Sequence, residues 1–530
     1  MEKIRVWAKV QRIERLNPLF PSEAGHELAE TGTSPFDTVL SLSREMVTAV
    51  CQVLGSEPLG GEAGGKLRHL RYPAQPASSA YRPSTDDIAR IVLGDLKSTA
   101  HRALNVASLA NRPEIDVCVD GHSIVTRHLA VLAMTGAGKS WTVRRIIEQL
   151  ADKNYPIVIF DPHGDYTGLA DVGALKARVR RYYAQYRVFD EPADHVRRVI
   201  ESLSSYELAK TQAQHFDDIF GAARAFVRAS DSELTQRANW LSDYIQNPKI
   251  IQFGIKPDLY FLGDFVEALV RAGKNNDQQC FQQIEQWADV RFAFNPQEAG
   301  WLAGLLTRIR PAAKALRLME GISKKVSGAA APLPVDRTEL VKHGGISIIV
   351  LAGYTSDFQA TLYSMIAGEL FQARVDGSLP LPVLLVLEEA HNFAGAHANT
   401  TAEARAVMMS KQIAQEGRKF GVGLVLISQR PSRLDETTLS QCNSYVIMRM
   451  VNPADQSFVR KVIETIAEDE VKLLPDLDVG EALLSGQFIN FPVLVRMKAP
   501  SSKGEREEID AFVQLEQIVE QLKRDNKNQQ

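Results

Sequence analysis

The feature that most constrains this chain is the turn Ala-Met-Thr-Gly-Ala-Gly-Lys-Ser at 133–140. An apolar run at 128–134 leads into it, and a segment with helical spacing follows at 140–151. Between a strand and a helix, glycines let main-chain N–H groups point at a phosphate, and the helix start adds a partial positive charge. The sequence therefore predicts a phosphate-binding loop within a parallel α/β sheet.

Each residue of this loop has an expected role in binding ATP and Mg²⁺. Lys139 is expected to reach the β- and γ-phosphates, and Ser140 to coordinate Mg²⁺. The other nucleotide-binding candidates are Thr135, Gly136, Ala137, Gly138 and Trp141. Ala133 stands where the pattern has glycine, which is tolerable if its φ is negative. The alternative is a chance glycine-rich turn, which the intact Gly-Lys-Ser makes the weaker interpretation.

Acidic residues end two of the apolar runs. The run at 383–387 ends in Glu388 and Glu389. Because ligands of open α/β sheets bind at the carboxyl ends of strands, Glu388 is predicted to hold the water shell of Mg²⁺. Glu389 is predicted to be the general base towards the attacking water. A strand ending in solvated acids is the alternative. Asp161 ends the run at 157–161 and is predicted near the nucleotide or metal; an aspartate that opens a turn explains it equally well.

Three polar residues outside these runs are further catalytic candidates. Gln429 follows an apolar run, where a γ-phosphate sensor would lie. Arg418 suits an arginine finger delivered to a neighbouring subunit, because its guanidinium fork fits phosphate oxygens; a cation that offsets a helix dipole is its alternative. Arg127 precedes the first strand and is either a group that reaches nucleotide at a subunit boundary or an ordinary surface arginine.

The pattern along the chain predicts a parallel sheet covered on both faces, interrupted by helices. The apolar runs are 128–134, 157–161, 346–351, 383–387, 423–428 and 445–448, and a hairpin-like pair follows at 482–484 and 493–495. The expected divisions are an N-terminal assembly or partner domain at 1–115, core segments at 116–190 and 338–500, a helical insertion at 191–337, and a C-terminal helix and tail at 501–530. Within the first division, we expect a strand at 6–13 and a helix at 35–54.

Composition and charge limit the location and the binding partners expected for this chain. The chain has 530 residues, 45% of them hydrophobic, and no apolar stretch of bilayer-spanning length. Its first residues lack the apolar core of a signal peptide, so a cytoplasmic location is expected. The four cysteines form no Cys-x-x-Cys pair, which disfavours a zinc or disulfide framework. The net charge of −3 argues against a surface coated with DNA contacts, although a basic channel between subunits is compatible with it.

Several motifs, in order and spacing, resemble the HerA branch of the HerA/FtsK superfamily. They are Arg-His at 127–128, Thr-Gly-Ala-Gly-Lys-Ser at 135–140, Asp-Pro-His-Gly-Asp-Tyr at 161–166, Glu-Glu-Ala-His-Asn-Phe at 388–393, Glu-Gly-Arg-Lys-Phe-Gly at 416–421, Ser-Gln-Arg-Pro at 428–431, Gly-Glu-Ala at 480–482 and Phe-Pro-Val at 491–493. The resemblance implies an α/β, RecA-like P-loop core of the additional-strand class, a helical insertion and a small, β-barrel-like N-terminal domain.

The resemblance also implies an assembly and partners. These are a homohexameric ring that threads double-stranded DNA, with ATP between subunits, and a partner effector, either a nuclease or a sirtuin-like NAD-consuming protein. Such pairs act in DNA end processing or in bacterial antiphage defence, and the N-terminal region favours defence. Ala133 and Glu388, which replace the family's Gly and Asp, bear on turnover rather than on nucleotide binding.

Two hypotheses follow for what the chain does. The first is an ATP-driven DNA translocase or helicase. The second is an ATP-binding scaffold that assembles and regulates the effector with little translocation. A candidate DNA contact is a basic, tyrosine-containing stretch at 176–198; a solvated helix face balanced by Asp190, Glu191 and Asp194 is its alternative. Stimulation of hydrolysis by duplex DNA separates the two hypotheses.

Overall fold

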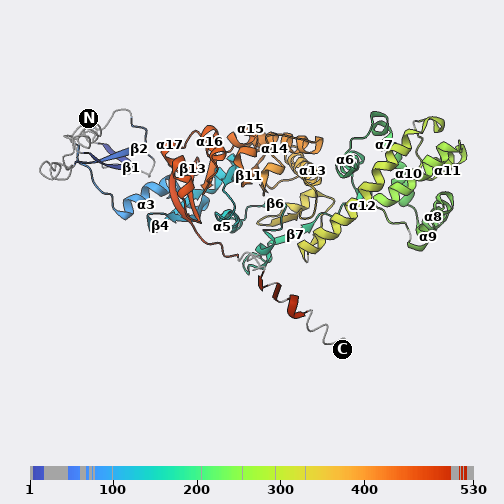
Figure 1. Cartoon of the computed structure of the whole chain (residues 1–530), viewed down its shortest axis with the longest axis horizontal. Coiled ribbons are helices and arrows are strands. Elements are labelled where there is room, and N and C mark those ends of the chain that lie inside the picture. Colours follow the sequence, from blue (N-terminus) through green and yellow to red (C-terminus); the bar gives the residue numbers. More distant parts are fainter. Residues whose placement is uncertain are drawn as a thin grey trace, which may run out of the picture.

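The computed structural model describes residues 4–16, 46–59, 67–70, 75, 78–97, 99–204, 206–253, 255–292, 294–328, 330–502, 512–513, 515–516 and 518–521. Figure 1 shows an elongated molecule with an α/β core in its middle. A two-stranded ribbon lies towards one end and a helical subdomain at the other. Among the described residues, no helix combines the length and the apolar character needed to span a bilayer.

The core is built on a twelve-stranded sheet of described residues. Its strands are β3 (Ala103–Leu109), β4 (Arg112–Asp120), β5 (Leu129–Leu132), β6 (Ile157–Asp161), β7 (Val179–Tyr183), β8 (Ala331–Pro332), β9 (Ile346–Val350), β10 (Val383–Leu387), β11 (Val422–Ser428), β12 (Ser444–Met448), β13 (Glu481–Gly486) and β14 (Val493–Met497). Their order is β4-β3-β14-β13-β12-β5-β11-β10-β6-β9-β7-β8. The strands from β12 to β8 in this order run parallel. The remaining four extend the sheet as antiparallel strands.

The strand order confirms the predicted fold class. β11 lies between β5, which leads into the phosphate loop, and β10, which ends in the acidic pair. This intervening strand is what the additional-strand class requires. With strands about 4.8 Å apart, β5 and β10 are separated by about 10 Å. A long side chain from one strand end can therefore reach the other.

Helices cover both faces of the sheet. They are α3 (Thr85–Leu93), α4 (Gly121–Arg127), α5 (Lys139–Asp152), α13 (Ser356–Val375), α14 (Thr401–Phe420), α15 (Glu436–Ser440), α16 (Pro453–Val462) and α17 (Glu468–Lys472). Alternate side chains of a strand serve opposite faces. Leu385 and Leu387 join the apolar core of α13 and α14, whereas Val386 joins the core of α5. Burial on both faces explains why these strands are continuous apolar runs.

The predicted central strands are confirmed, and two strand regions were missed. The apolar runs correspond to β5, β6, β9, β10, β11 and β12, and the hairpin-like pair to β13 and β14. β3 and β4 form an antiparallel hairpin that pairs with β14, so the sheet crosses the division expected between 115 and 116. β7 lies within the basic stretch 176–198 as the last strand but one of the sheet, and its two adjacent arginines stand between the buried Val179 and Tyr182.

A helical subdomain occupies the region predicted as an insertion. Its helices are α6 (Ala193–Ser204), α7 (Lys210–Val227), α8 (Asp231–Ile245), α9 (Lys249–Phe253), α10 (Leu259–Lys274), α11 (Gln278–Ala288) and α12 (Trp301–Ser327). α12 returns the chain to the core, where the Ser323 hydroxyl donates to the Val350 carbonyl over 3.1 Å. Gly353, with φ 88°, lies against α12, and a Cβ there would come within 2.5 Å of Ile322. The end of α12 is thus packed closely on the core.

The chain termini depart from the sequence expectations. β1 (Ile4–Leu16) confirms the strand expected at 6–13, and it pairs antiparallel with β2 (Met46–Pro58). The helix expected at 35–54 is wrong over its described part, 46–54, because pairing with β1 overrides an apolar spacing that also fits a helix. Residues 35–45 lie outside the described residues. The described N-terminal ribbon is a two-stranded sheet rather than a closed barrel. The expected C-terminal helix is described at 512–513, 515–516 and 518–521, which are helical.

His128 fixes the entry into β5. Its backbone adopts φ 62°, in the left-handed region. Its Nδ1 accepts the Leu424 N–H over 3.0 Å, so Nε2 carries the proton and donates to the Ala414 carbonyl over 3.1 Å. Burial lowers the pKa of His128 to about 4. The neutral imidazole therefore joins β5 and β11 to the last turns of α14.

We predict that His128→Gln weakens the pH dependence of stability. The unfolded chain protonates this histidine near pH 6.5, whereas the folded chain excludes the proton down to about pH 4. The stability that the neutral ring contributes is present above pH 6.5 and is lost as the pH falls to about 4, a change of about 3 kcal/mol. Thermal unfolding between pH 7 and 4.5 measures this. The variant should be less stable at pH 7 but lose less on acidification, and an equal loss in both proteins contradicts the prediction.

Candidate active site

The loop at 133–140 lies at the carboxyl edge of the sheet, between β5 and α5. Gly136 and Gly138 adopt φ 80° and 97°, which a side chain would strain. Ala133 is outside the left-handed region, so the alanine is tolerated there as expected. The Met134 N–H donates to the Arg449 carbonyl over 3.0 Å, and the Ala137 carbonyl accepts the Gly480 N–H over 3.0 Å. Neighbouring strand ends thus hold the loop open as a main-chain cradle.

The first residue of α5 meets the end of β10. Lys139 Nζ lies 2.5 Å from Glu388 Oε1 and 3.1 Å from Glu389 Oε1. All three side chains are buried, with at most 7% of each exposed. A buried ammonium needs charged partners, and here two carboxylates supply them. The structure therefore brings together the loop lysine and both acidic strand-end residues.

These contacts give the two carboxyl groups different pKa values. Burial raises the pKa of Glu388 to about 7, against the opposing effects of Lys139 and Tyr166. Partial burial pushes the pKa of Glu389 upward too, but the neighbouring His391 and Lys139 outweigh it and lower the pKa to about 2. Burial works against the charge of Lys139, yet the two carboxylates keep its pKa raised. Glu389 is thus the stronger acid of the pair, and Glu388 binds a proton more readily.

Tyr166 and Asp161 position Glu388. The Tyr166 hydroxyl, fully buried, donates to Glu388 Oε2 over 2.6 Å. Asp161 Oδ1 accepts the N–H groups of Gly164 and Asp165 over 2.8 and 3.1 Å, and its Oδ2 accepts that of Tyr166 over 3.0 Å. Both oxygens of Asp161 are therefore occupied by the turn that follows β6. These are the contacts expected of an aspartate that opens a turn. A role of Asp161 in binding the nucleotide stays a prediction.

Glu389 has one oxygen free of hydrogen bonds. Its backbone adopts φ 48°, a strained value for a glutamate at a strand end. Its buried Oε2 accepts no hydrogen bond from the described residues, although His391 Nδ1 lies 3.3 Å away. An unsatisfied buried carboxylate oxygen is costly without a ligand or water. It points to a polar molecule that completes the site.

The remaining loop candidates line the same edge. The Thr135 hydroxyl donates to Gln429 Oε1, which ties the loop to the end of β11. Thr135 and Gly136 are exposed, and Ser140 is half-buried at the start of α5. Trp141, beside Ser140, exposes 47% of its surface. The structure thus places Gln429 next to the loop, as its predicted role requires.

Arg127 and Arg418 lie at the other edge of the sheet. Arg127 ends α4, just before β5, and Arg418 lies in the last turn of α14, just before β11. Both strands then run towards the phosphate loop, and four residues of β5 alone span about 13 Å. Arg418 is exposed and Arg127 is half-buried. Neither side chain is therefore placed at the phosphate loop of its own chain.

The described residues fit a nucleoside triphosphate with Mg²⁺. The glycine cradle and Lys139 match a polyphosphate, and Glu389 keeps one buried oxygen without a hydrogen bond beside them. Ser140 and Glu388 are the residues that would hold the metal, which supplies charge to offset that of the phosphates. The sequence reasoning missed Tyr166 and His391 as members of the site. Both lie in motifs that it quoted, but only the fold shows what they contact.

The chain is similar in sequence to proteins named as HerA helicases. Residues 104–237 match the family described as "Helicase HerA, central domain". The chain is 27% identical to the DNA double-strand break repair helicase HerA of Pyrococcus furiosus, over 86% of this chain and 78% of the relative. It is also 27% identical to a probable DNA double-strand break repair helicase HerA of Methanocaldococcus jannaschii, over 87% of this chain and 88% of that one. Among solved structures, VirB4 of Thermoanaerobacter pseudethanolicus aligns with a TM-score of 0.45 and 16% identity, over 75% of this chain and 96% of that one.

We predict that Lys139→Ala and Glu389→Gln separate nucleotide binding from turnover. Lys139→Ala removes the only described buried cation that touches both carboxylates, so it should lose nucleotide affinity and hydrolysis together. Glu389→Gln keeps the cradle and the lysine but removes the base. It should bind Mg²⁺-nucleotide within a few-fold of wild type, while hydrolysis falls about 10²- to 10⁴-fold. Calorimetry with a non-hydrolysable analogue and phosphate release measure the two effects. Full turnover by Glu389→Gln contradicts the base assignment.

Proposed function

Because this chain belongs to the HerA-type ATPases of the HerA/FtsK superfamily, we propose that it is an ATP-hydrolysing DNA translocase that works as a hexameric ring. The observation that carries the proposal is the buried contact of Lys139 with Glu388 and Glu389 beside the glycine cradle. It gathers a phosphate-binding cation, a metal-binding carboxylate and a base at one edge of the sheet. That combination serves phosphoryl transfer to water.

Each residue of the site has its own proposed role in hydrolysis. The loop N–H groups and Lys139 hold the phosphates, and Ser140 and Glu388 hold Mg²⁺. Glu389 accepts a proton from the attacking water, which Gln429 orients. His391 and Lys139 both lower the pKa of Glu389, and when Lys139 turns to the phosphates its contribution is withdrawn. The base thus becomes stronger once nucleotide is bound, because a higher pKa favours proton acceptance.

The two arginines support a ring. Arg418 and Arg127 lie at the edge opposite the phosphate loop of their own chain. In a head-to-tail ring, this edge of one subunit faces the loop edge of the next. Arg418 would then supply the cation that the transition state needs, and Arg127 would contact the nucleotide at the same boundary. Each catalytic site would be complete only between two subunits.

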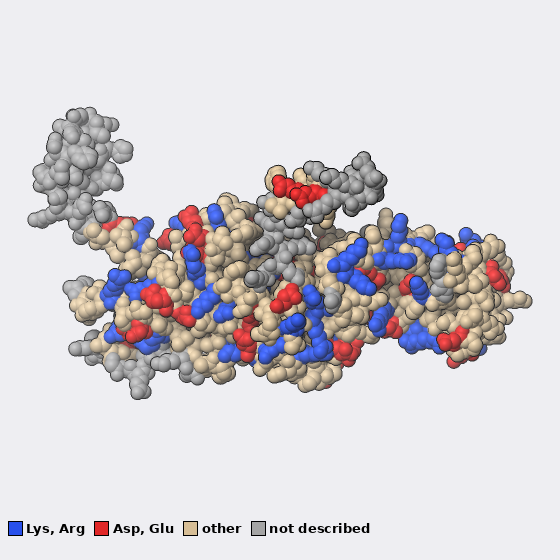
Figure 2. Space-filling view, turned by 90° about the horizontal axis from the view of Figure 1, so that it is seen from below, with Lys and Arg blue, Asp and Glu red and all other residues tan. Residues whose placement is uncertain are grey.

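Double-stranded DNA is the proposed molecule along which the translocase moves. Figure 2 shows Lys and Arg side chains along one face of the molecule, interspersed with acidic ones. Lys176, Arg178, Arg180 and Arg187 of the basic stretch are exposed, whereas Tyr182 and Tyr186 are buried. The arginines are thus available to phosphates, and those tyrosines are not available to stack on bases. This distribution supports contact with the DNA backbone rather than with base sequence.

A partner enzyme completes the proposed role. The relatives from Pyrococcus furiosus and Methanocaldococcus jannaschii are named for double-strand break repair, which supports DNA end processing with a nuclease. The alternative effector, a sirtuin-like NAD-consuming protein in antiphage defence, rests on the family resemblance. Both settings are in the cytoplasm. The N-terminal ribbon exposes Val47, Val50 and Val53, a surface suited to assembly or to docking of the effector.

We predict that duplex DNA stimulates ATP hydrolysis by the full-length chain. Because binding to phosphates releases counterions, stimulation should weaken steeply between about 50 and 200 mM salt. Phosphate release with and without a duplex longer than the ring measures this, with Glu389→Gln as the inactive control. Hydrolysis that ignores DNA over this range, in a chain that still forms a ring, favours the regulatory scaffold instead.

We predict that mixing two inactive variants restores activity. Lys139→Ala damages the loop side of a site and Arg418→Ala the finger side, so each alone should be inactive. In rings assembled from an equal mixture, about a quarter of the sites combine an intact loop with an intact finger. Hydrolysis should recover to about that fraction. Lys139→Ala mixed with Glu389→Gln, both on the loop side, should recover nothing. Native mass spectrometry verifies mixing; mixed rings without recovery contradict the shared site.

A further inference from the structure

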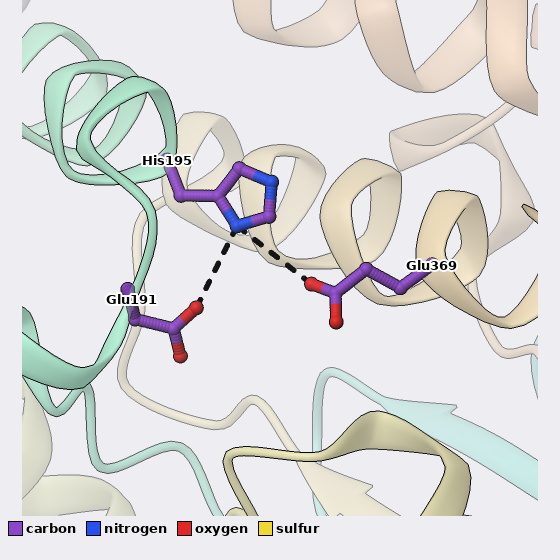
Figure 3. Close-up of side chains that lie close together, drawn as sticks. All are labelled: Glu191, His195 and Glu369. Carbon is purple, nitrogen blue, oxygen red and sulfur yellow. Dashed lines mark ion pairs between the residues drawn. The ribbon is translucent and has the colours of Figure 1, made fainter.

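A cluster of three side chains able to bind a metal lies where the helical subdomain joins the core. Glu191 precedes α6, His195 lies in the first turn of α6, and Glu369 belongs to α13. Figure 3 shows both carboxylates directed at the same nitrogen of the imidazole. The three donor atoms lie within 4.8 Å of one another. The cluster is separate from the phosphate loop and has no part in the hydrolysis described above.

The separations within this cluster are those of ligands rather than of hydrogen bonds. His195 Nδ1 lies 3.6 Å from Glu191 Oε2 and 3.7 Å from Glu369 Oε1. Direct N–H···O bonds are about 2.7–3.2 Å long. Ligands that share a tetrahedral Zn²⁺ at about 2.0–2.2 Å lie about 3.4 Å apart. Small movements of the three side chains would suffice to enclose such an ion.

Two of the three donors lack any other partner. His195 Nδ1 and Glu369 Oε1 are buried atoms without a hydrogen bond among the described residues. Buried polar atoms are costly when unsatisfied. A cation between them would satisfy both.

A neighbouring side chain orients one donor of the cluster, as outer-shell groups orient metal ligands. Arg337, itself buried, donates to Glu191 Oε1 and leaves Oε2 to face the imidazole. On the other side of the ring, Asp194 Oδ2 lies 4.0 Å from His195 Nε2, and Asp194 also pairs with Arg198 over 3.1 Å. At 4.0 Å, Asp194 Oδ2 is beyond direct hydrogen-bond distance of Nε2. Arg337 is therefore the neighbour that orients a donor of the cluster, and Asp194 lies outside it.

We propose that Glu191, His195 and Glu369 bind one divalent transition-metal ion, with Zn²⁺ as the ion tested first. One imidazole and two carboxylates form a donor set that zinc accepts in proteins, with a water as the fourth ligand. The ion ties the start of the helical subdomain to α13, which packs on the ATPase sheet. It is a structural link between the two parts of the molecule and does not depend on the proposed function.

The test uses the full-length chain, stripped of metal and then dialysed against Zn²⁺ with excess Mg²⁺. Elemental analysis should find one zinc per chain, and zinc should raise the midpoint of thermal unfolding by several degrees. His195→Ala and Glu369→Gln should each lose the ion and the shift. Asp194→Asn, which removes a neighbouring carboxylate but no donor atom, should retain both. Glu388→Gln should also retain both, which separates this ion from any at the nucleotide site.

Two results would overturn the proposal. One is a folded wild-type chain that binds no zinc under these conditions. The other is zinc retained at full stoichiometry by His195→Ala, with circular dichroism showing a folded variant. Anomalous scattering at the zinc edge gives the position of a bound ion directly. A peak between α6 and α13 supports the proposal, and a peak elsewhere overturns it.

Discussion

The buried contact of Lys139 with Glu388 and Glu389 is the interaction on which the rest of the site depends. A cation and two carboxylates are withdrawn from water at the carboxyl edge of the sheet, and each is tolerable only because the others are present. Forming it requires β5 and β10 to lie two strand spacings apart with β11 between them. The same order places Gln429 beside Thr135. The strand order of the sheet thus determines which side chains meet at the site.

Much of this arrangement was predictable because parallel strands bury both faces. Leu385 and Val386 face opposite layers, so β10 is apolar throughout and its acidic end stands out. Residues 46–54 of β2 were predicted as part of a helix because Val47, Val50 and Val53 have helical spacing, and only the pairing with β1 makes this segment a strand. The contact of Tyr166 with Glu388 joins residues 222 positions apart, which no local pattern can reveal.

The two edges of the sheet carry different halves of the proposed chemistry. The loop edge holds the phosphate-binding and metal-binding groups, whereas Arg127 and Arg418 lie where the strands begin. In the proposed ring, the arginines of one subunit would complete the site of the next. The helical subdomain joins the same core through α12 and the cluster of Glu191, His195 and Glu369. The helical subdomain and the core are thus in contact at two separate places.

The most direct measurement of the central claim is a structure of the full-length chain with Mg²⁺ and a non-hydrolysable ATP analogue. We expect the terminal phosphates in the cradle of Gly136 and Gly138, with Lys139 Nζ moved from Glu388 to a phosphate oxygen and Glu389 facing the terminal phosphorus. A nucleotide bound elsewhere, with Lys139 still held between the two carboxylates, would contradict the account.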